Sequence, residues 1–184
     1  IDNDIYINYN LEELEIVLYV HFNKMYYDTY TTRLKAHFII DTFCINQEYS
    51  FTAKELSNAI KMNRSYFESK QTAMQVVSDL QSFKATVNQE LENLDDQRGN
   101  KKYLKDQVVE SNVPNSFNLE IPLFLGCENT IVEVEILVDA DSFEFSLISP
   151  MLIEKQQNEG AYIIESEISK IEGDCPGIKT FETT

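Results

Sequence analysis

The chain has no tryptophan and, in 184 residues, only five glycines, four prolines and three cysteines. None of the glycines stands in a GxGxxG or GxxxxGKS/T pattern, which excludes the usual backbone cradles for nucleotide phosphates. The cysteines, Cys44, Cys127 and Cys175, form no CxxC pair, and an odd number argues against a disulfide framework. The cysteine pattern therefore predicts a protein of a reducing compartment.

Long apolar runs are also missing. No stretch approaches the roughly 18 to 20 apolar residues that a membrane helix needs, and no signal-peptide pattern opens the chain. The first residue is Ile1 rather than methionine, so we expect a further segment upstream. The sequence therefore predicts a soluble protein that does not enter a membrane.

Positive charge is scarce. The chain has 15 Lys and Arg against 31 Asp and Glu, a formal net charge of -16. Duplex nucleic acid would be repelled, because binding it depends on neutralising phosphates with Lys and Arg. The densest basic group consists of Arg98, Lys101, Lys102 and Lys105, and so few charges are typical of a solvated turn. Direct binding of nucleic acid is therefore not expected.

What the chain does contain is regular alternation of apolar and polar residues. Hydrophobic residues make up 43% of the chain, the composition of an ordinary globular domain. Period-two alternation predicts strands at 5–9, 14–22, 33–40, 131–138 and 142–147, a strand between Pro114 and Pro122 at a sheet edge, and a long hairpin from 83–91 and 103–109. A polar and aromatic connection is expected at 23–32.

Helix signals separate these strands. Thr52 with Glu55 and Ser65 with Glu68 both have the spacing of a capping box, in which the two residues satisfy each other's backbone N–H groups. From Met151 onward the apolar spacing is helical, with one face that carries Ile153, Gln157, Ala161, Ile164, Ile168 and Ile171.

We therefore predict one α+β domain over residues 1–184. It comprises a mainly antiparallel sheet of six to eight strands, two short capped helices and one long C-terminal amphipathic helix packed on one face of the sheet.

No catalytic motif is present, and each isolated candidate has a simpler interpretation. His21 and His37 could bind a metal with Asp28 or Asp41, but both histidines fall on polar or rim positions. Cys44 could be a nucleophile with a histidine as its base, yet a buried free cysteine is the commoner case.

Acidic pairs are the other candidates. Glu133 and Glu135 share one face of a predicted strand, about 7 Å apart, a separation compatible with acid–base catalysis but also normal for the solvent face of a strand. Asp139 and Asp141 form a DxD pattern, which in a short connection is typical of a turn. We predict no enzymatic activity, no catalytic residue, no metal and no cofactor.

A tyrosine-rich loop is the strongest surface candidate. The sequence MYYDTY at 25–30 predicts a partner-binding site at Tyr26, Tyr27, Asp28 and Tyr30, because tyrosine offers a large contact area at low entropic cost. The alternative is that one or two of these tyrosines only cover the edge of the sheet.

Several segments in this order resemble a known family. They are FTAKELSNAI, SFKATVNQELENL, NVPNSFNLEIPLFLG, IVEVEILV and FEFSL, followed by a helix. Together they resemble the YfdQ-like domain of unknown function of tailed phages and prophages. The match covers Leu14 to about Phe181, and its most specific part is VPxxFxLxIPxF from Val113 to Phe124.

The resemblance implies no catalytic residue and no cofactor. It implies a phage-encoded protein in a host bacterial cytoplasm or in a virion. We expect a non-enzymatic accessory protein that binds a protein partner or itself, as a homo-oligomer.

Two alternatives remain open. One is an acidic DNA mimic that inhibits a host nuclease or restriction system, with rows of carboxylates on the strands at 14–22 and 131–138. The other is a structural component of the virion. An enzyme that uses Glu133, Asp139 and Asp141 is the least favoured interpretation.

Overall fold

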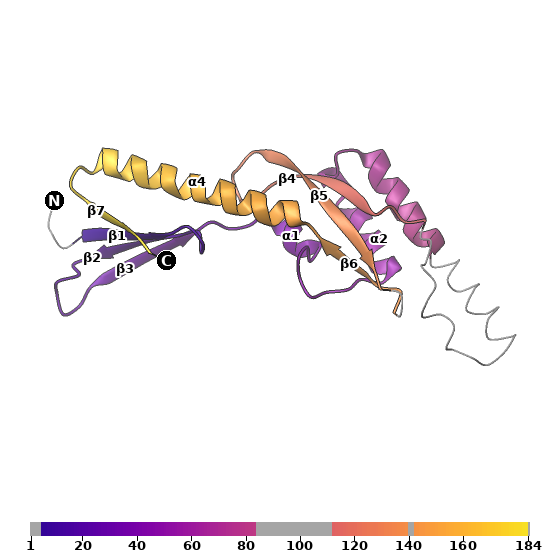
Figure 1. Cartoon of the computed structure of the whole chain (residues 1–184), viewed down its shortest axis with the longest axis horizontal. Coiled ribbons are helices and arrows are strands. Elements are labelled where there is room, and N and C mark those ends of the chain that lie inside the picture. The colour runs from indigo at the N-terminus through magenta and orange to yellow at the C-terminus, as the bar shows by residue number, and fades with distance from the viewer. Residues whose placement is uncertain (1–4, 84–111, 140–141, 184) are drawn as a thin grey trace, which may run out of the picture. The chain divides into compact units, whose positions relative to one another are not determined.

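The computed structural model describes residues 5–83, 112–139 and 142–183 (Figure 1). The chain divides into two compact units. Unit 1 comprises Ile1–Ala36, Leu123–Cys127 and Met151–Thr184, and unit 2 comprises His37–Pro122 and Glu128–Pro150. Helices and mainly antiparallel sheets confirm the predicted α+β class, but the described strands form two sheets, of four and three strands, and not the one sheet that we predicted. A single domain stays a prediction, since two compact units can belong to one domain.

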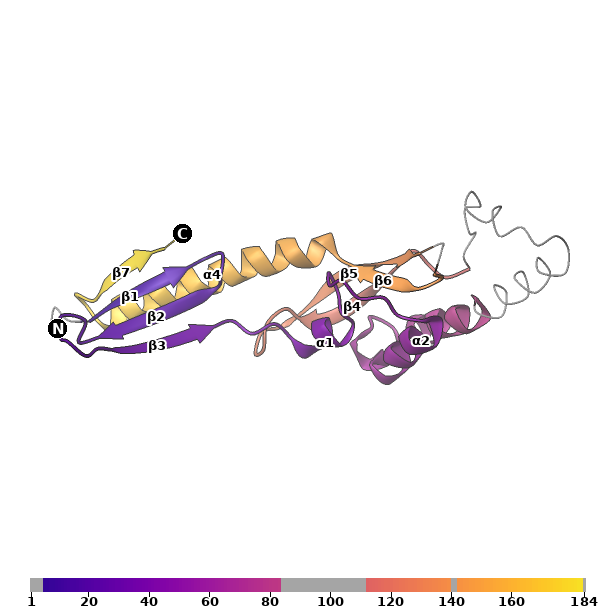
Figure 2. The same ribbon diagram turned by 90° about the horizontal axis from the view of Figure 1, so that it is seen from below.

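Unit 1 contains a four-stranded sheet with a long helix on one face; in Figure 2 the helix α4 lies behind β1 and β2. The strand order is β3-β2-β1-β7. β1, β2 and β3 are antiparallel, whereas β7 runs parallel to β1. The elements are β1 (Ile5–Asn10), β2 (Glu15–Val20), β3 (Asp28–Arg33), α4 (Pro150–Asp174) and β7 (Lys179–Glu182).

The long C-terminal helix is confirmed, and it packs on the sheet of unit 1. Ile164 and Ile168 of α4 form a buried core with Ile7 of β1. Ile153, which we expected on the buried face, is 59% exposed, while Leu152 is buried. The residues at 152, 160, 164 and 168 follow one i, i+4 row, and Ile153 lies about 100° around the helix from that row.

The turn between β1 and β2 rests on α4. The Asn10 carboxamide oxygen accepts hydrogen bonds from the Glu12 and Glu13 N–H groups, at 2.8 and 2.7 Å. Gln157 donates its side-chain amide to the Leu11 carbonyl at 2.8 Å. A Cβ atom on Gly160 would lie 2.5 Å from Cδ1 of Leu14. The glycine, which weakens the helix locally, therefore makes room for the side chain of this turn.

Unit 2 contains a three-stranded antiparallel sheet of order β4-β5-β6, with helices against its buried face. Phe117 of β4 contacts the rings of Phe43 and Phe67, and Phe145 of β6 contacts Phe83. The strands are β4 (Ser116–Pro122), β5 (Asn129–Val138) and β6 (Phe145–Ile148), and the helices are α1 (Phe38–Thr42), α2 (Ala53–Met62) and residues 70–83.

Pro122 closes β4 as the sequence predicts, whereas Pro114 precedes the strand, which begins at Ser116. β4 lies at an edge of its sheet and ends at Pro122, so a residue without an N–H group closes the strand. The strand expected at 142–147 begins later, at Phe145, because Phe143 adopts a left-handed φ of 55°.

One of the two capping boxes is confirmed. The Thr52 hydroxyl accepts from the Glu55 N–H at 3.3 Å, and the Glu55 carboxylate accepts from the Thr52 N–H at 2.9 Å. The second box was wrong: Ser65 lies in the short 3₁₀ helix η1 (Arg64–Tyr66), and helix begins again only after Ser69. Between them Phe67 is extended and forms a bridge with Leu119 of β4. This tertiary pairing overrides the local cap signal.

The predicted strand at 33–40 was also wrong. Residues 38–42 form helix α1, which buries the adjacent Ile39 and Ile40, whereas β3 lies mostly inside the predicted connection at 23–32. All six residues of β3 are exposed, so the strand has no buried face to produce alternation. Most of the predicted hairpin at 83–91 and 103–109 lies outside the described residues; Phe83 is helical.

Candidate functional site

An aromatic cluster covers the face of the unit 1 sheet that points away from α4. Ile7 of β1 packs against α4, so its neighbour Tyr6 points to the opposite face, since side chains alternate along a strand. Tyr6 pairs with Tyr19 of β2, and the two rings stack with centroids 4.6 Å apart. This cross-strand pair is the centre of the cluster.

Three more rings complete the cluster. Phe22 lies edge-on to Tyr6 at 5.1 Å and contacts Tyr27 at 5.5 Å, and Phe181 of β7 lies 5.9 Å from Tyr6. Phe22, Tyr27 and Phe181 are 45%, 51% and 49% exposed. We call Tyr6, Tyr19, Phe22, Tyr27 and Phe181 the aromatic face. About half of the surface of its outer rings therefore contacts water.

The predicted site residues occupy different places around this face. Tyr27 belongs to it, and Tyr26 is 84% exposed in the turn between β2 and β3. Asp28 and Tyr30 lie on β3 opposite Val20 and Leu18. Because Leu18 packs against the core with α4, Tyr30 shares the α4 side of the sheet. Their part in binding stays a prediction.

Sequence reasoning missed four members of the aromatic face: Tyr6, Tyr19, Phe22 and Phe181. One signal was available, because Tyr19 falls on the side of its strand opposite the expected core. In the predicted strand at 14–22, the alternation sets Phe22 on the same side as Leu18, which faces the core. His21, however, adopts a left-handed φ of 59°, and the strand ends at Val20 before that turn. The chain therefore leads Phe22 to the rings of Tyr6 and Tyr19.

Side chains of both charge signs lie beside the tyrosines of the aromatic face. On this face Arg33 of β3 forms an ion pair with Glu15 of β2. Lys179 of β7 lies opposite Tyr6 in the parallel register of β7 with β1. Burial raises the pKa of Tyr6 above its ordinary value, and the neighbouring phenols Tyr19 and Tyr27 raise that pKa further. Its hydroxyl is thus a neutral donor and acceptor at pH 7.

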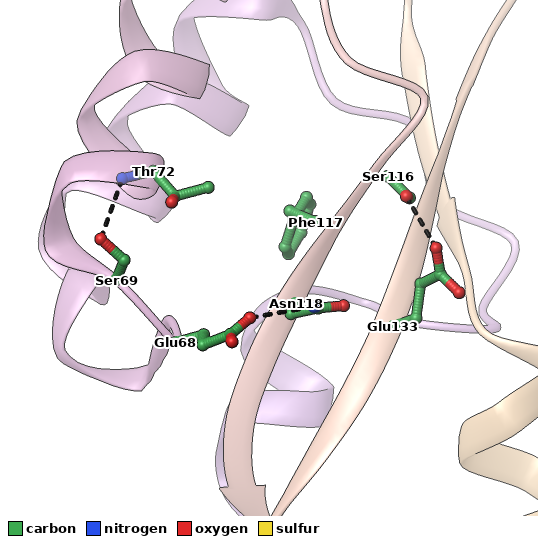
Figure 3. A pocket seen from close by; sticks show the side chains of 7 residues that line it. All are labelled: Glu68, Ser69, Thr72, Ser116, Phe117, Asn118 and Glu133. Atoms are coloured by element: carbon green, nitrogen blue, oxygen red, sulfur yellow. Dashed lines mark hydrogen bonds between the residues drawn. The ribbon is translucent and has the colours of Figure 1, made fainter.

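A polar groove in unit 2 is the second candidate (Figure 3). Its cavity of about 210 Å³ is lined by Glu68, Ser69, Thr72, Ser116, Phe117, Asn118 and Glu133. The Asn118 amide donates to Glu68 at 3.0 Å, and the Ser116 hydroxyl donates to Glu133 at 2.8 Å. Each carboxylate thus accepts a hydrogen bond from β4, which ties it to the sheet.

The other acidic candidates take separate places. Glu133 and Glu135 alternate with buried valines along β5, the pattern of a solvent face. The Asp139 carboxylate accepts hydrogen bonds from the N–H and hydroxyl of Ser142, at 2.7 and 3.0 Å. This is the expected turn role, and Asp141 lies outside the described residues.

Cys44 and the two histidines form neither the nucleophile–base pair nor the metal site that the sequence allows. Cys44 follows α1, and its thiol has a raised pKa through burial and the negative charge of Asp41, the opposite of an activated nucleophile. In the turn after β2, Nδ1 of His21 lies 3.3 Å from Nζ of Lys24. His37 is buried beside the rings of Phe38 and Tyr66.

The described residues contain neither a metal-binding cluster nor a membrane-spanning helix. Within residues 5–83, 112–139 and 142–183, no group of three or more His, Cys, Asp and Glu side chains could hold a metal ion. None of the helices in these ranges has the length and apolar character to cross a membrane.

Comparison of the chain with protein-family models, curated proteins and solved structures finds no match.

Proposed function

We propose that this protein works by binding another protein through the aromatic face of unit 1 and the tyrosine-rich turn beside it. The observation that carries the proposal is the exposure of three rings, Phe22, Tyr27 and Phe181, around a stacked pair. Contiguous exposed aromatic surface is unusual on a solvated protein and marks interaction sites. Tyrosine and phenylalanine are also enriched in the buried centres of interfaces.

The rest of the proposal concerns context. The resemblance to the YfdQ-like domain supports a phage or prophage accessory protein that acts in the host cytoplasm or in the virion. We propose no catalytic role, and the engaged carboxylates of Glu68, Glu133 and Asp139 support that choice.

The test compares surface variants that leave the cores intact. We expect the double variant Phe22→Ser and Tyr27→Ser to bind the partner at least tenfold more weakly, since hot-spot aromatic residues contribute about 2 kcal/mol or more. The partner is captured from lysate of infected host cells, purified, and titrated by isothermal calorimetry. Tyr162→Ser is the control, because Tyr162 is 71% exposed on α4 and outside the aromatic face.

Two results would contradict the proposal. One is the absence of any saturable partner from infected and uninfected lysates. The other is an affinity that falls equally in the double variant and in Tyr162→Ser, which would place the contact elsewhere.

A second candidate function is supported by the outer face of the unit 2 sheet. Glu120 of β4 pairs with Ile131 of β5, and Glu133 and Glu135 continue the same exposed face. We propose that these carboxylates imitate DNA phosphates toward a basic nuclease. Charge reversal at Glu133 and Glu135 should then abolish competition with DNA for the enzyme, and added salt should weaken the wild-type competition. Unchanged competition by the reversed variant would contradict this role.

A further inference from the structure

β3 is an edge strand with an open outer side. It stands first in the order β3-β2-β1-β7, and its residues, Asp28–Arg33, are all exposed. No strand described in residues 5–83, 112–139 or 142–183 pairs with that side. A row of backbone donors and acceptors is therefore available for another strand.

The register identifies those backbone groups. The Leu34 N–H donates to the Leu14 carbonyl at 3.1 Å, one step beyond the pair of Glu15 with Arg33. In an antiparallel pair every second residue bonds to the partner strand. Even-numbered residues of β3 therefore bond to β2. The N–H and C=O groups of Thr29, Thr31 and Arg33 point outward.

β3 lacks several of the features that protect edge strands from pairing. It contains neither proline nor lysine, and its register with β2 runs without interruption over all six residues. Threonine and tyrosine also have high strand propensity. By contrast, β4 ends in Pro122 and is bridged by Phe67, and the other two edge strands, β6 and β7, have only four residues each. β3 is thus the edge best suited to accept a strand.

We propose that a second copy of this chain adds its own β3 to this edge, antiparallel, about a two-fold axis at Tyr30. The inference goes beyond the proposed function, which concerns a different protein bound through the aromatic face. In such a dimer the outward N–H and C=O groups of one β3 must bond to the outward groups of the other. Odd-numbered residues therefore lie opposite odd-numbered residues, and even-numbered residues opposite even-numbered ones. The two-fold axis must therefore pass midway between the two copies of one residue.

Side-chain chemistry selects Tyr30 as that residue. The axis at Tyr30 sets the two Tyr30 side chains opposite each other at a non-hydrogen-bonded pair, where side chains approach closest. It also sets Thr29 opposite Thr31. An axis at Thr31 would instead set Asp28 opposite Leu34, a charge against an apolar side chain.

Charge also favours a second copy in this register. β3 carries one acid, Asp28, and one base, Arg33, so the strand is neutral although the chain carries -16. The register sets Asp28 opposite Thr32 and Arg33 opposite Tyr27, an arrangement that allows cation–π contact and opposes no like charges. The remaining repulsion acts over longer distances, so salt should strengthen the dimer by screening it.

A cysteine series tests the register directly. In a Cys175→Ser background, Tyr30→Cys should form a disulfide-linked dimer under mild oxidation, because opposed non-hydrogen-bonded Cα atoms lie about 4.5 Å apart, within disulfide range. Thr31→Cys should not, since its copy would lie two positions along the strand, about 8 Å away. The background protein with Cys44 and Cys127 controls for the native thiols.

A proline variant tests the edge itself. Thr31→Pro removes an outward N–H without removing a bond to β2, so the sheet should fold while the dimer dissociates at least tenfold more readily in sedimentation equilibrium. Thr31→Val is the matched control and should dimerise as the parent does. Circular dichroism confirms that both variants fold.

Three outcomes would overturn the inference: a monomer at every concentration tested, a dimer unaffected by Thr31→Pro, or equal crosslinking of Tyr30→Cys and Thr31→Cys. If Thr31→Pro abolished binding of a different protein while no dimer formed, the edge would have another occupant. Loss of the dimer alone would leave the proposed function intact, because Phe22→Ser tests partner binding at a residue that this register does not set opposite the second copy.

Discussion

Replacement of Asn46 by alanine is expected to lower the free energy of unfolding by about 3 kcal/mol. The Asn46 side-chain amide donates to the Ser149 carbonyl at 3.0 Å, and its oxygen accepts from the Ser149 N–H at 2.7 Å. Ser149 is fully buried, whereas Asn46 is exposed, so the Asn46 side chain covers the backbone groups of Ser149 that it binds. Asn46 also has a φ of 61°, a left-handed conformation that asparagine tolerates and alanine adopts only at a cost.

Two variants separate these causes. Asn46→Gly permits the left-handed backbone but removes both hydrogen bonds, so it should cost less than Asn46→Ala by about 1 kcal/mol. Asn58→Ala, at an exposed position of α2, should change stability by less than about 0.5 kcal/mol. Urea unfolding followed by far-ultraviolet circular dichroism gives all three values. A cost below 1 kcal/mol for Asn46→Ala would show that the Asn46–Ser149 pair contributes little.

Replacement of Phe145 by alanine should cost about 3 to 5 kcal/mol, the range for a buried phenylalanine that leaves a cavity. The ring is fully buried and lies 5.2 Å from the ring of Phe83. The backbone of Phe145 exchanges two hydrogen bonds with Phe51, at 2.7 and 2.8 Å. Alanine keeps those bonds, so the loss measures the side chain.

Phe38→Ala is the matched control, because Phe38 belongs to the same unit and is 50% exposed. It should cost about 1 kcal/mol or less. Phe145→Leu should recover part of the loss by refilling the cavity. Equal costs for Phe145→Ala and Phe38→Ala in urea unfolding would contradict the position of Phe145 in the core of unit 2.

Local sequence predicted the elements that have one buried face. In β5 the alternation of valine and glutamate matches burial residue by residue, and the Thr52 box marks a real helix start. Prediction from local sequence was wrong where an element has no buried face or depends on a distant strand. β3 is exposed on every residue, and the bridge of Phe67 to β4 depends on a strand about fifty positions later.

The candidate site was predictable only in part for the same reason. The tyrosine-rich turn is visible as a local composition, which led to Tyr26, Tyr27, Asp28 and Tyr30. The aromatic face instead depends on the register that stacks Tyr6 on Tyr19 and on β7, which brings Phe181 to the sheet from the other end of the chain. The residues adjacent in sequence predict neither the register of β1 with β2 nor the parallel pairing of β7 with β1.

The uneven distribution of tyrosine has a spectroscopic consequence. With no tryptophan in the chain, its intrinsic fluorescence comes from tyrosine. Seven of the ten tyrosines, at positions 6, 9, 19, 26, 27, 30 and 162, lie in the ranges of unit 1. Ultraviolet emission should therefore follow unit 1 during unfolding, while a tryptophan introduced at Phe38 would emit at longer wavelength and report on unit 2. One sample could then show whether the two units unfold together.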